Sequence, residues 1–200
     1  MASRTAPRDG TTPKRPYIVG VGGTAVPDSS VERVLRYTLE LAAAQGAQTE
    51  LFDGLRIHLP HYSRPKEGMK RTGRVRRYVE ALRRADGIIL ATPCYHGGPS
   101  GLLKNALDYA EDLSQDMRPY FDGRAVGIIV CGYGWQSTAM ALASLRNIVH
   151  ALRGWPTPLG MALNMRQKIS LDSGTLGEPA AVKQAKTMVT QVVAFSRHAL

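Results

Sequence analysis

Short apolar runs alternate along the chain with longer segments in which apolar residues recur at helical spacing. Within 29–46, Val31, Val34, Leu35 and Leu39 fall on one helical face. The short runs instead hold consecutive β-branched and aliphatic residues, which is typical of buried strands. This pattern predicts strands over 17–23, 47–53, 86–92, 124–132 and 159–164, and helices over 29–46, 71–85, 100–113, 136–154 and 178–200.

The first predicted helix carries its own start and stop signals. Ser29 and Glu32 form the capping-box pattern, in which side chain and backbone hydrogen-bond reciprocally at a helix N-terminus. Gly46 is typical of a helix C-terminus. Residues 54–70 lack either periodicity and predict an irregular connection.

The alternation of strands and helices predicts an α/β fold in three layers, with a parallel sheet covered by helices on both faces. In open sheets of this kind the ligand binds outside the carboxyl ends of the strands, at the topological switch point. Candidate chemistry is therefore expected in the loops that follow the strands at 17–23, 86–92 and 124–132.

Composition narrows the class of protein. A chain of 200 residues with 44% hydrophobic residues predicts one globular domain, expected over 17–200. Residues 1–16 have no apolar core and predict a disordered basic tail rather than a secretory signal. No apolar run is long enough for a membrane span, so no membrane partner is expected. Cys94 and Cys131 are expected to be free thiols in a cytoplasmic setting, and no cysteine–histidine spacing suggests a metal.

The formal net charge of +10 comes largely from the tail and from residues 64–84. Three explanations stay open for the second concentration: a solvated helix face, attraction of a phosphorylated cofactor, or nucleic-acid binding. No helix-turn-helix, zinc finger or aromatic RNA-binding signature accompanies the charge, so no nucleic-acid partner is expected.

All three loops at the expected ligand edge are rich in glycine. The first, "GVGGTAVPDSS" (20–30), offers hydroxyls and a helix N-terminus, as phosphate sites do, but it lacks the Gly-Lys-Ser/Thr ending of a P-loop. The second spans 91–101, and the third is "CGYGWQS" (131–137). Glycines in all three loops favour a large flat or phosphorylated ligand that approaches the backbone.

The stretch "TPCYHGGPSGLLKNALDY" (92–109) resembles the motif of the NAD(P)H-dependent FMN reductase family, which has a flavodoxin-like fold. That motif reads T/S-P-E-Y-N-x-S-x-P-G-x-L-K-N-A-I/L-D-W/Y. The residues in agreement are Thr92, Pro93, Tyr95, Gly101, Leu103, Lys104, Asn105, Ala106, Leu107, Asp108 and Tyr109. The resemblance implies a five-stranded parallel sheet in the order 2-1-3-4-5.

The resemblance also implies an FMN site with NADPH or NADH as co-substrate. The phosphate would lie in the first loop and the ring along the other two. The residues implied are Gly22, Thr24, Ser29, Ser30, Pro93, Cys94, Tyr95, His96, Gly97, Gly98, Gly132, Tyr133 and Gly134. Family members commonly form homodimers or homotetramers, so a homo-oligomer is expected.

The chain departs from the family pattern at four positions. Val26 stands where the phosphate loop has an arginine, which removes a charge-assisted contact worth about 1.5–3 kcal/mol. Cys94, His96 and Gly98 replace a glutamate, an asparagine and a serine.

The implied reaction passes a hydride from the nicotinamide to flavin N5 and then on to an acceptor in a ping-pong sequence. The backbone N–H groups of Gly97 and Gly98 are expected near N5, and His96 is the candidate catalytic side chain. Lys104 and Asp108, at i and i+4 spacing, are expected to pair on one helix.

Several functions remain open from the sequence. The protein could be an FMN reductase that supplies a flavin-dependent monooxygenase, or an FMN-containing quinone, azo or nitro reductase acting on a small-molecule acceptor. It could also be a flavin-binding electron carrier without enzymatic activity, or a basic nucleic-acid-binding domain.

Overall fold

The computed structural model describes residues 15–66, 68, 70–167 and 176–198. The strands are β1 (Tyr17–Gly22), β2 (Gln48–Phe52), β3 (Gly87–Tyr95), β4 (Gly98–Pro99), β5 (Ala125–Gly132), β6 (Trp155–Pro156) and β7 (Met161–Asn164). The helices are α1 (Ser30–Ala44), α2 (Gly54–Ile57), α3 (Gly73–Arg84), α4 (Gly101–Asp108), the 3₁₀ helix η1 (Tyr109–Leu113), α5 (Trp135–Ala151) and α6 (Pro179–His198).

The strands form one sheet in the order β2-β1-β3-β5-β6, with β4 paired to β3 and β7 paired to β5. The pairs β1–β2, β1–β3 and β3–β5 are all parallel. The carboxyl ends of β1, β3 and β5 therefore lie at the same edge of the sheet, where the ligand site was expected.

Strands are present in all five predicted segments, and these five pair in the predicted order 2-1-3-4-5, as β2-β1-β3-β5-β7. The predicted count of five is wrong, because β4 and β6 bring the sheet to seven strands. β4 is the short return of a hairpin and pairs antiparallel with β3. The outer strand is divided, because β6 pairs with the start of β5 and β7 with its end. Pro156 and Pro158 lie at this division, where they withhold backbone donors from the ladder.

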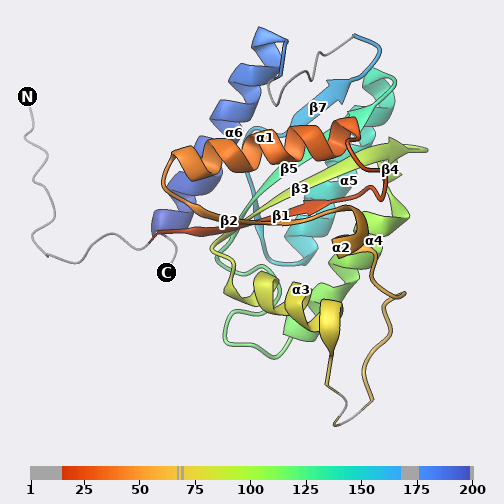
Figure 1. Ribbon diagram of the computed structural model, residues 1–200, viewed down its shortest axis with the longest axis vertical. Coiled ribbons are helices and arrows are strands. Elements are labelled where there is room, and N and C mark those ends of the chain that lie inside the picture. The colour runs from red at the N-terminus through yellow and green to blue at the C-terminus, as the bar shows by residue number, and fades with distance from the viewer. Residues whose placement is uncertain (1–14, 67, 69, 168–175, 199–200) are drawn as a thin grey trace, which may run out of the picture.

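Alternating strand residues face two separate helical layers. Val19 and Val21 of β1 pack in a core with residues of α3, α4 and α5. Ile18, which precedes Val19 in the strand, packs in a second core with residues of α1 and α6. Figure 1 shows α1 and α6 on one side of the sheet and α3 and α4 on the other. Both faces are thus covered, as the alternation of apolar runs and helical segments predicted.

Other predictions hold with changes at the ends of elements. The helix expected over 100–113 is α-helical only to Asp108 and continues as η1. The irregular segment 54–70 contains the four-residue helix α2. Residues 1–14 of the predicted tail lie outside the described residues. Within the described part of the chain, no helix is both long and apolar enough to cross a membrane.

Candidate functional site

The first two glycine-rich loops are joined by hydrogen bonds at the carboxyl edge of the sheet. The amide of Gly23 donates to the carbonyl of Ala91 at 2.7 Å. The Ser100 hydroxyl donates to the carbonyl of Gly23 at 2.7 Å, and the Ser100 amide donates to Thr92 Oγ1 at 3.0 Å. Ser100 also caps α4 by accepting from the amide of Leu103. The spacing of the loops after β1 and β3 is therefore fixed by one buried serine.

Glycine is required at position 23 because these loops approach each other closely. A Cβ on Gly23 would lie 2.7 Å from Ser100 Oγ and 3.0 Å from both Leu103 Cβ and Thr92 Oγ1. Ser100 is not among the site residues predicted from the sequence. Its only signal was its position before a helical pattern, which is typical of an N-cap.

The second and third loops meet at Cys94. Its thiol donates to the carbonyl of Ser137 at 3.1 Å. A Cβ on Gly132 would lie 3.0 Å from Cys94 Cβ and 2.9 Å from Thr138 Cγ2. Cys94 thus fills a tight contact between the two loops. Cys131, the other cysteine, is buried, and this burial raises the pKa of its thiol to about 12.

A two-residue hairpin turn presents the middle of the second loop. Tyr95 pairs with Gly98, and the intervening His96 and Gly97 have φ angles of 52° and 79°. Positive φ at both central positions is the geometry of a type I′ turn, which matches the twist of the strands. His96 is exposed at this turn, and its imidazole forms no hydrogen bond with the described residues.

The first loop uses much of its own hydrogen-bonding capacity. The first half of the predicted capping box is confirmed, since Ser29 Oγ accepts from the amide of Glu32. The returning bond is shifted by one residue, because Glu32 Oε2 accepts from the amide of Asp28 and not from that of Ser29. Thr24 Oγ1 accepts from the amide of Val26. The hydroxyl protons of Thr24 and Ser29 stay available to donate, but three amides of the loop are already paired.

Two carboxylates lie below this loop. Arg36 donates to Glu32 Oε1 at 2.6 Å and to Asp53 Oδ2 at 3.2 Å. Burial raises the pKa of the Asp53 carboxyl above its ordinary value, and the neighbouring Glu32 carboxylate adds to the rise, while Arg36 opposes it. Arg36 therefore neutralises its own helix and does not replace the arginine that Val26 lacks.

Exposed aromatic side chains surround the second and third loops. Tyr95 is 61% exposed, Tyr133 75% and Trp135 55%. Met140, also exposed, lies beside Gly97, since a Cβ there would be 3.2 Å from Met140 Cε. These residues form what we call the aromatic rim: Tyr95, Tyr133, Trp135 and Met140.

The backbone between the rim residues is open enough for a flat ring. A Cβ on Gly98 would meet only the carbonyl of Tyr95, at 3.8 Å, and one on Gly134 only Ser137 Oγ, at 3.8 Å. Gly101, at the start of α4, has nothing within 4 Å of that position. The residues present thus fit a planar group that contacts backbone, whereas the phosphate end has hydroxyls but no arginine within the loop.

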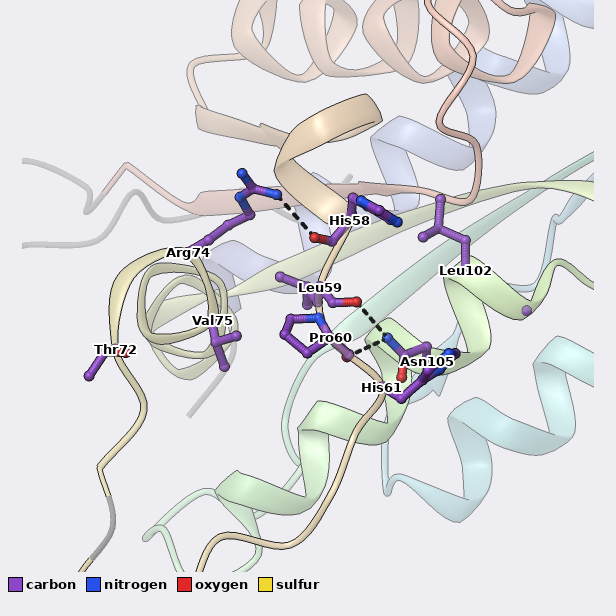
Figure 2. A pocket seen from close by; sticks show the side chains of 10 residues that line it. His58, Leu59, Pro60, His61, Thr72, Arg74, Val75, Leu102 and Asn105 are labelled. Atoms are coloured by element: carbon purple, nitrogen blue, oxygen red, sulfur yellow. Dashed lines mark hydrogen bonds between the residues drawn. The ribbon is translucent and has the colours of Figure 1, made fainter.

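A pocket of about 760 Å³ lies next to the second loop (Figure 2). It lies between residues 58–61, the start of α3 and the first turns of α4. Asn105 holds its wall in place by donating to the carbonyl of Pro60 at 2.9 Å and accepting from the amide of Tyr62 at 2.8 Å. This contact gives a structural role to the asparagine of the family motif. Lys104 and Asp108, its neighbours, form the predicted i, i+4 ion pair at 2.5 Å.

The structure thus connects the predicted site residues of the second and third loops through Cys94, and joins the first loop to the second through Ser100. Their role in binding a flavin stays a prediction. Among the described residues, no group of three or more His, Cys, Asp or Glu side chains could hold a metal ion.

Comparison with known proteins shows the family to which the chain is related. A family model described as NADPH-dependent FMN reductase matches residues 16–167. The FMN-dependent NADPH-azoreductase of Staphylococcus aureus (strain USA300) is 31% identical over 184 residues, which cover 86% of this chain and 91% of that protein. The FMN-dependent NADPH-azoreductase of Staphylococcus haemolyticus (strain JCSC1435) is 36% identical over 123 residues. That match covers 60% of this chain and 62% of the relative, less than two thirds of its length.

A solved structure agrees with the fold. FerB from Paracoccus denitrificans, a flavoenzyme NAD(P)H:(acceptor) oxidoreductase, matches with a TM-score of 0.75 at 18% identity. The match covers 92% of this chain and 98% of that one. The predicted flavodoxin-like α/β fold is thereby confirmed.

Proposed function

The chain belongs to the NADPH-dependent FMN reductase family and is an NAD(P)H-dependent FMN oxidoreductase. We propose that it reduces flat aromatic acceptors of the azo or quinone class. FMN, when bound, would supply the hydride and electron transfer between NADPH and the acceptor. The protein itself has to bind FMN and its substrates, orient them and exclude water from the site. The relatives named as azoreductases support the choice of acceptor.

The aromatic rim is the observation that carries the proposal. Tyr133 and Trp135 are more than half exposed beside backbone that is open at Gly134. Exposed apolar side chains gathered in one place mark binding surfaces, and aromatic rings stack on flat ligands in offset or edge-on geometry. A planar acceptor would find these rings at the same edge where the three loops expose their backbone.

The hairpin supplies the other functions that the chemistry needs. Gly97 and Gly98 expose backbone at the turn, where an amide donor can face the reacting edge of the ring. His96 lies on the same turn, exposed and without a partner among the described residues, so it is the side chain placed to deliver a proton to a reduced acceptor.

A second function is favoured by the phosphate end of the site. Val26 is 64% exposed in the loop where the family motif has its arginine, and the Glu32 carboxylate already occupies the helix N-terminus. Both features weaken the hold on a phosphate, because a charge-assisted contact is missing and an anion is already present. The protein would then release reduced FMN to a flavin-dependent monooxygenase.

One experiment tests both functions. Purified protein is mixed with FMN without oxygen, reduced with NADPH, and then offered an azo dye or a quinone. The proposal expects rapid bleaching of the flavin by NADPH and its rapid return on addition of the acceptor, with parallel double-reciprocal plots in the steady state. If the acceptor is reduced only by the protein-free filtrate, which contains released reduced FMN, and not by the protein itself, the second function holds. Absence of acceptor reduction by both protein and filtrate would contradict both.

We also propose a homodimer or homotetramer in the cytoplasm, formed by the single domain 17–200. The exposed apolar side chains of Val26, Leu55 and Met140 support an oligomer, since association would remove apolar surface from water. Light scattering on the purified protein tests the assembly, and a monomer at micromolar concentration would exclude it.

A further inference from the structure

We propose that the pocket beside the second loop binds the adenosine end of NADPH and recognises its 2′-phosphate through Arg74. This inference deepens the proposed function and rests on it. The chemistry required is a phosphate monoester on a ribose that also carries a flat purine base, and the pocket offers a cation together with apolar walls.

The position of the pocket suits a dinucleotide whose nicotinamide lies over the flavin loop. Gly101 and Leu102, which start α4 directly after the hairpin, form one wall of the pocket. Figure 2 shows Leu102 on this side and Arg74 on the other, with residues 58–61 between them. A ligand can therefore extend from the hairpin into the pocket without leaving the surface.

Charge distinguishes this pocket from two others along α3. Its lining includes Arg74, His58 and His61 but no aspartate or glutamate. The other two pockets each contain carboxylates as well as arginines. An anion is therefore attracted to the first pocket without a competing negative charge.

Ion pairs divide the arginines of the basic 64–84 segment into two groups. Among the described residues, Arg74, Arg76 and Arg84 have no carboxylate partner, and of these three only Arg74 lines this pocket. Arg71 pairs with Asp112 at 2.6 Å, Arg77 with Glu50 at 2.8 Å and Arg83 with Asp116 at 2.8 Å. Arg74 donates from Nη1 to the carbonyl of His58 at 3.0 Å and has no carboxylate partner among the described residues. That bond orients the guanidinium at the pocket and leaves its other N–H groups for a phosphate, which arginine recognises in bidentate geometry.

The rest of the pocket fits an adenosine. Leu59, Pro60 and Val75 provide apolar surface for a ring. Thr72, the N-cap residue of α3, makes no capping hydrogen bond with its side chain, so its hydroxyl is available to the ligand. Because Asn105 fixes the carbonyls of Leu59 and Pro60, the wall is arranged before the ligand binds.

The first test compares two arginines of the same helix. R74Q should lower the ratio of kcat/KM for NADPH to that for NADH by about tenfold to a hundredfold, the range of one charge-assisted hydrogen bond. R76Q makes the same change of charge on the same helix, outside the lining of this pocket, and should leave the ratio within about twofold. An equal change in both variants, or none in R74Q, would overturn the inference.

The second test needs no turnover, so its result is separate from that of the proposed function. Binding of 2′,5′-ADP and of 5′-ADP is measured by calorimetry on the FMN-loaded full chain. The inference expects tighter binding of 2′,5′-ADP, lost in R74Q and kept in R76Q. Equal binding of the two nucleotides would overturn it. It would also be overturned if NADPH displaced neither nucleotide.

Two further outcomes separate the site from the proposed function. If binding of a sulfonated aromatic acceptor requires Arg74 while binding of 2′,5′-ADP does not, the pocket serves the acceptor. If NADPH fails to reduce FMN although 2′,5′-ADP binds through Arg74, the proposed function fails and the site stands.

Discussion

The two ends of the central sheet use their polar groups in opposite ways. At the amino end, buried polar side chains bind backbone groups of the protein itself. At the carboxyl end, backbone and aromatic side chains are left open to the solvent. Since the same strands β1, β3 and β5 connect both ends, the difference arises from the residues placed just before and just after each strand.

Arg124 dominates the amino end. Its side chain is 0% exposed and donates to the carbonyls of Ala85, Arg83, Tyr120 and Asp122. Burial lowers the pKa of this guanidinium to about 10. Asp86 accepts from the amide of Tyr17 at 2.8 Å and is itself buried. This end contributes to stability because few groups are left without a partner.

The carboxyl end is organised for contact with something else. A Cβ on Gly101 would meet nothing within 4 Å, one on Gly98 or Gly134 would make a single contact at 3.8 Å, and Tyr133 and Trp135 extend into solvent. Exposing these aromatic rings together does not stabilise the fold, and exposed apolar patches of this kind mark binding sites. Substitutions at the amino end should therefore change stability first, and those at the carboxyl end should change binding first.

The largest expected effect is at the amino end. Arg124→Met should lower the free energy of unfolding by about 3–5 kcal/mol, because it leaves several buried carbonyls without donors. Urea denaturation measures this loss, and Arg124→Lys should fall between the two proteins. FMN affinity of the folded variant should be unchanged. A loss of less than about 1 kcal/mol would show that solvent reaches these carbonyls.

The next largest effect concerns both stability and FMN binding at the carboxyl end. Gly23→Ala should cost about 1–3 kcal/mol of stability, since its Cβ would lie 2.7 Å from Ser100 Oγ. It should also weaken FMN binding by about tenfold, because the first and second loops must separate to admit the methyl group. Fluorescence titration with FMN measures the binding.

Gly101→Ala is the matched control for stability. Nothing lies within 4 Å of the added methyl group, and alanine favours the helix by up to about 1 kcal/mol. Equal destabilisation by the two alanines would mean that helix geometry, and not the contact with Ser100, decides the outcome.

A smaller effect separates two exposed tryptophans. Trp135→Ala should raise KM for an azo or quinone acceptor by about threefold to tenfold, the equivalent of one aromatic contact. Trp155 is 59% exposed and packs against Phe195 at the amino end, so Trp155→Ala should leave this KM unchanged. Steady-state assays at saturating NADPH compare the two variants. A rise in both would place the acceptor away from the aromatic rim.

Sequence reasoning succeeded where a signal was local. The apolar runs predicted a strand in each of the five segments, and Ser29 was predicted to cap the first helix, which the structure confirms. The glycine-rich loops after β1 and β3 were expected to meet, and hydrogen bonds join them. Each of these features depends on residues within a few positions of one another or on the general topology of parallel sheets.

Long-range contacts could not be predicted. The hydrogen bond from Ser100 to Gly23 joins residues 77 positions apart, and neither a serine nor a glycine in the sequence indicates such a partner. Arg124, an arginine before a strand, gives no sign of complete burial. The strands β4 and β6 have two residues each, too few to show a period. The use of loop amides by Thr24 and Glu32 likewise depends on geometry that the sequence does not contain.

The smallest effect contrasts two carboxylates of the β2 region across pH. Asp53 lies at the carboxyl end, and burial beside Glu32 raises the pKa of its carboxyl, so its contribution to stability is lost as pH rises through the raised pKa. Glu50 lies nearer the amino end. Burial alone would raise the pKa of its carboxyl, but hydrogen bonds from Tyr17 and Arg77 outweigh burial and lower it. Its contribution is therefore present above the ordinary pKa and lost as pH falls through the lowered one.

Unfolding free energies measured by urea between about pH 3 and pH 7 should show these opposite signs, because carboxylates titrate in this range. Relative to the wild type, Asp53→Asn should gain stability as pH rises, and Glu50→Gln should lose it. Asp53→Asn should also tighten FMN modestly, since one negative charge below the phosphate loop is removed. Slopes of the same sign in both variants would contradict the contrast between the ends, because both carboxylates would then be paired alike. Opposite slopes would show that the charge of Asp53, at the carboxyl end where ligands are proposed to bind, destabilises the fold. They would also show that the charge of Glu50, nearer the amino end, stabilises it.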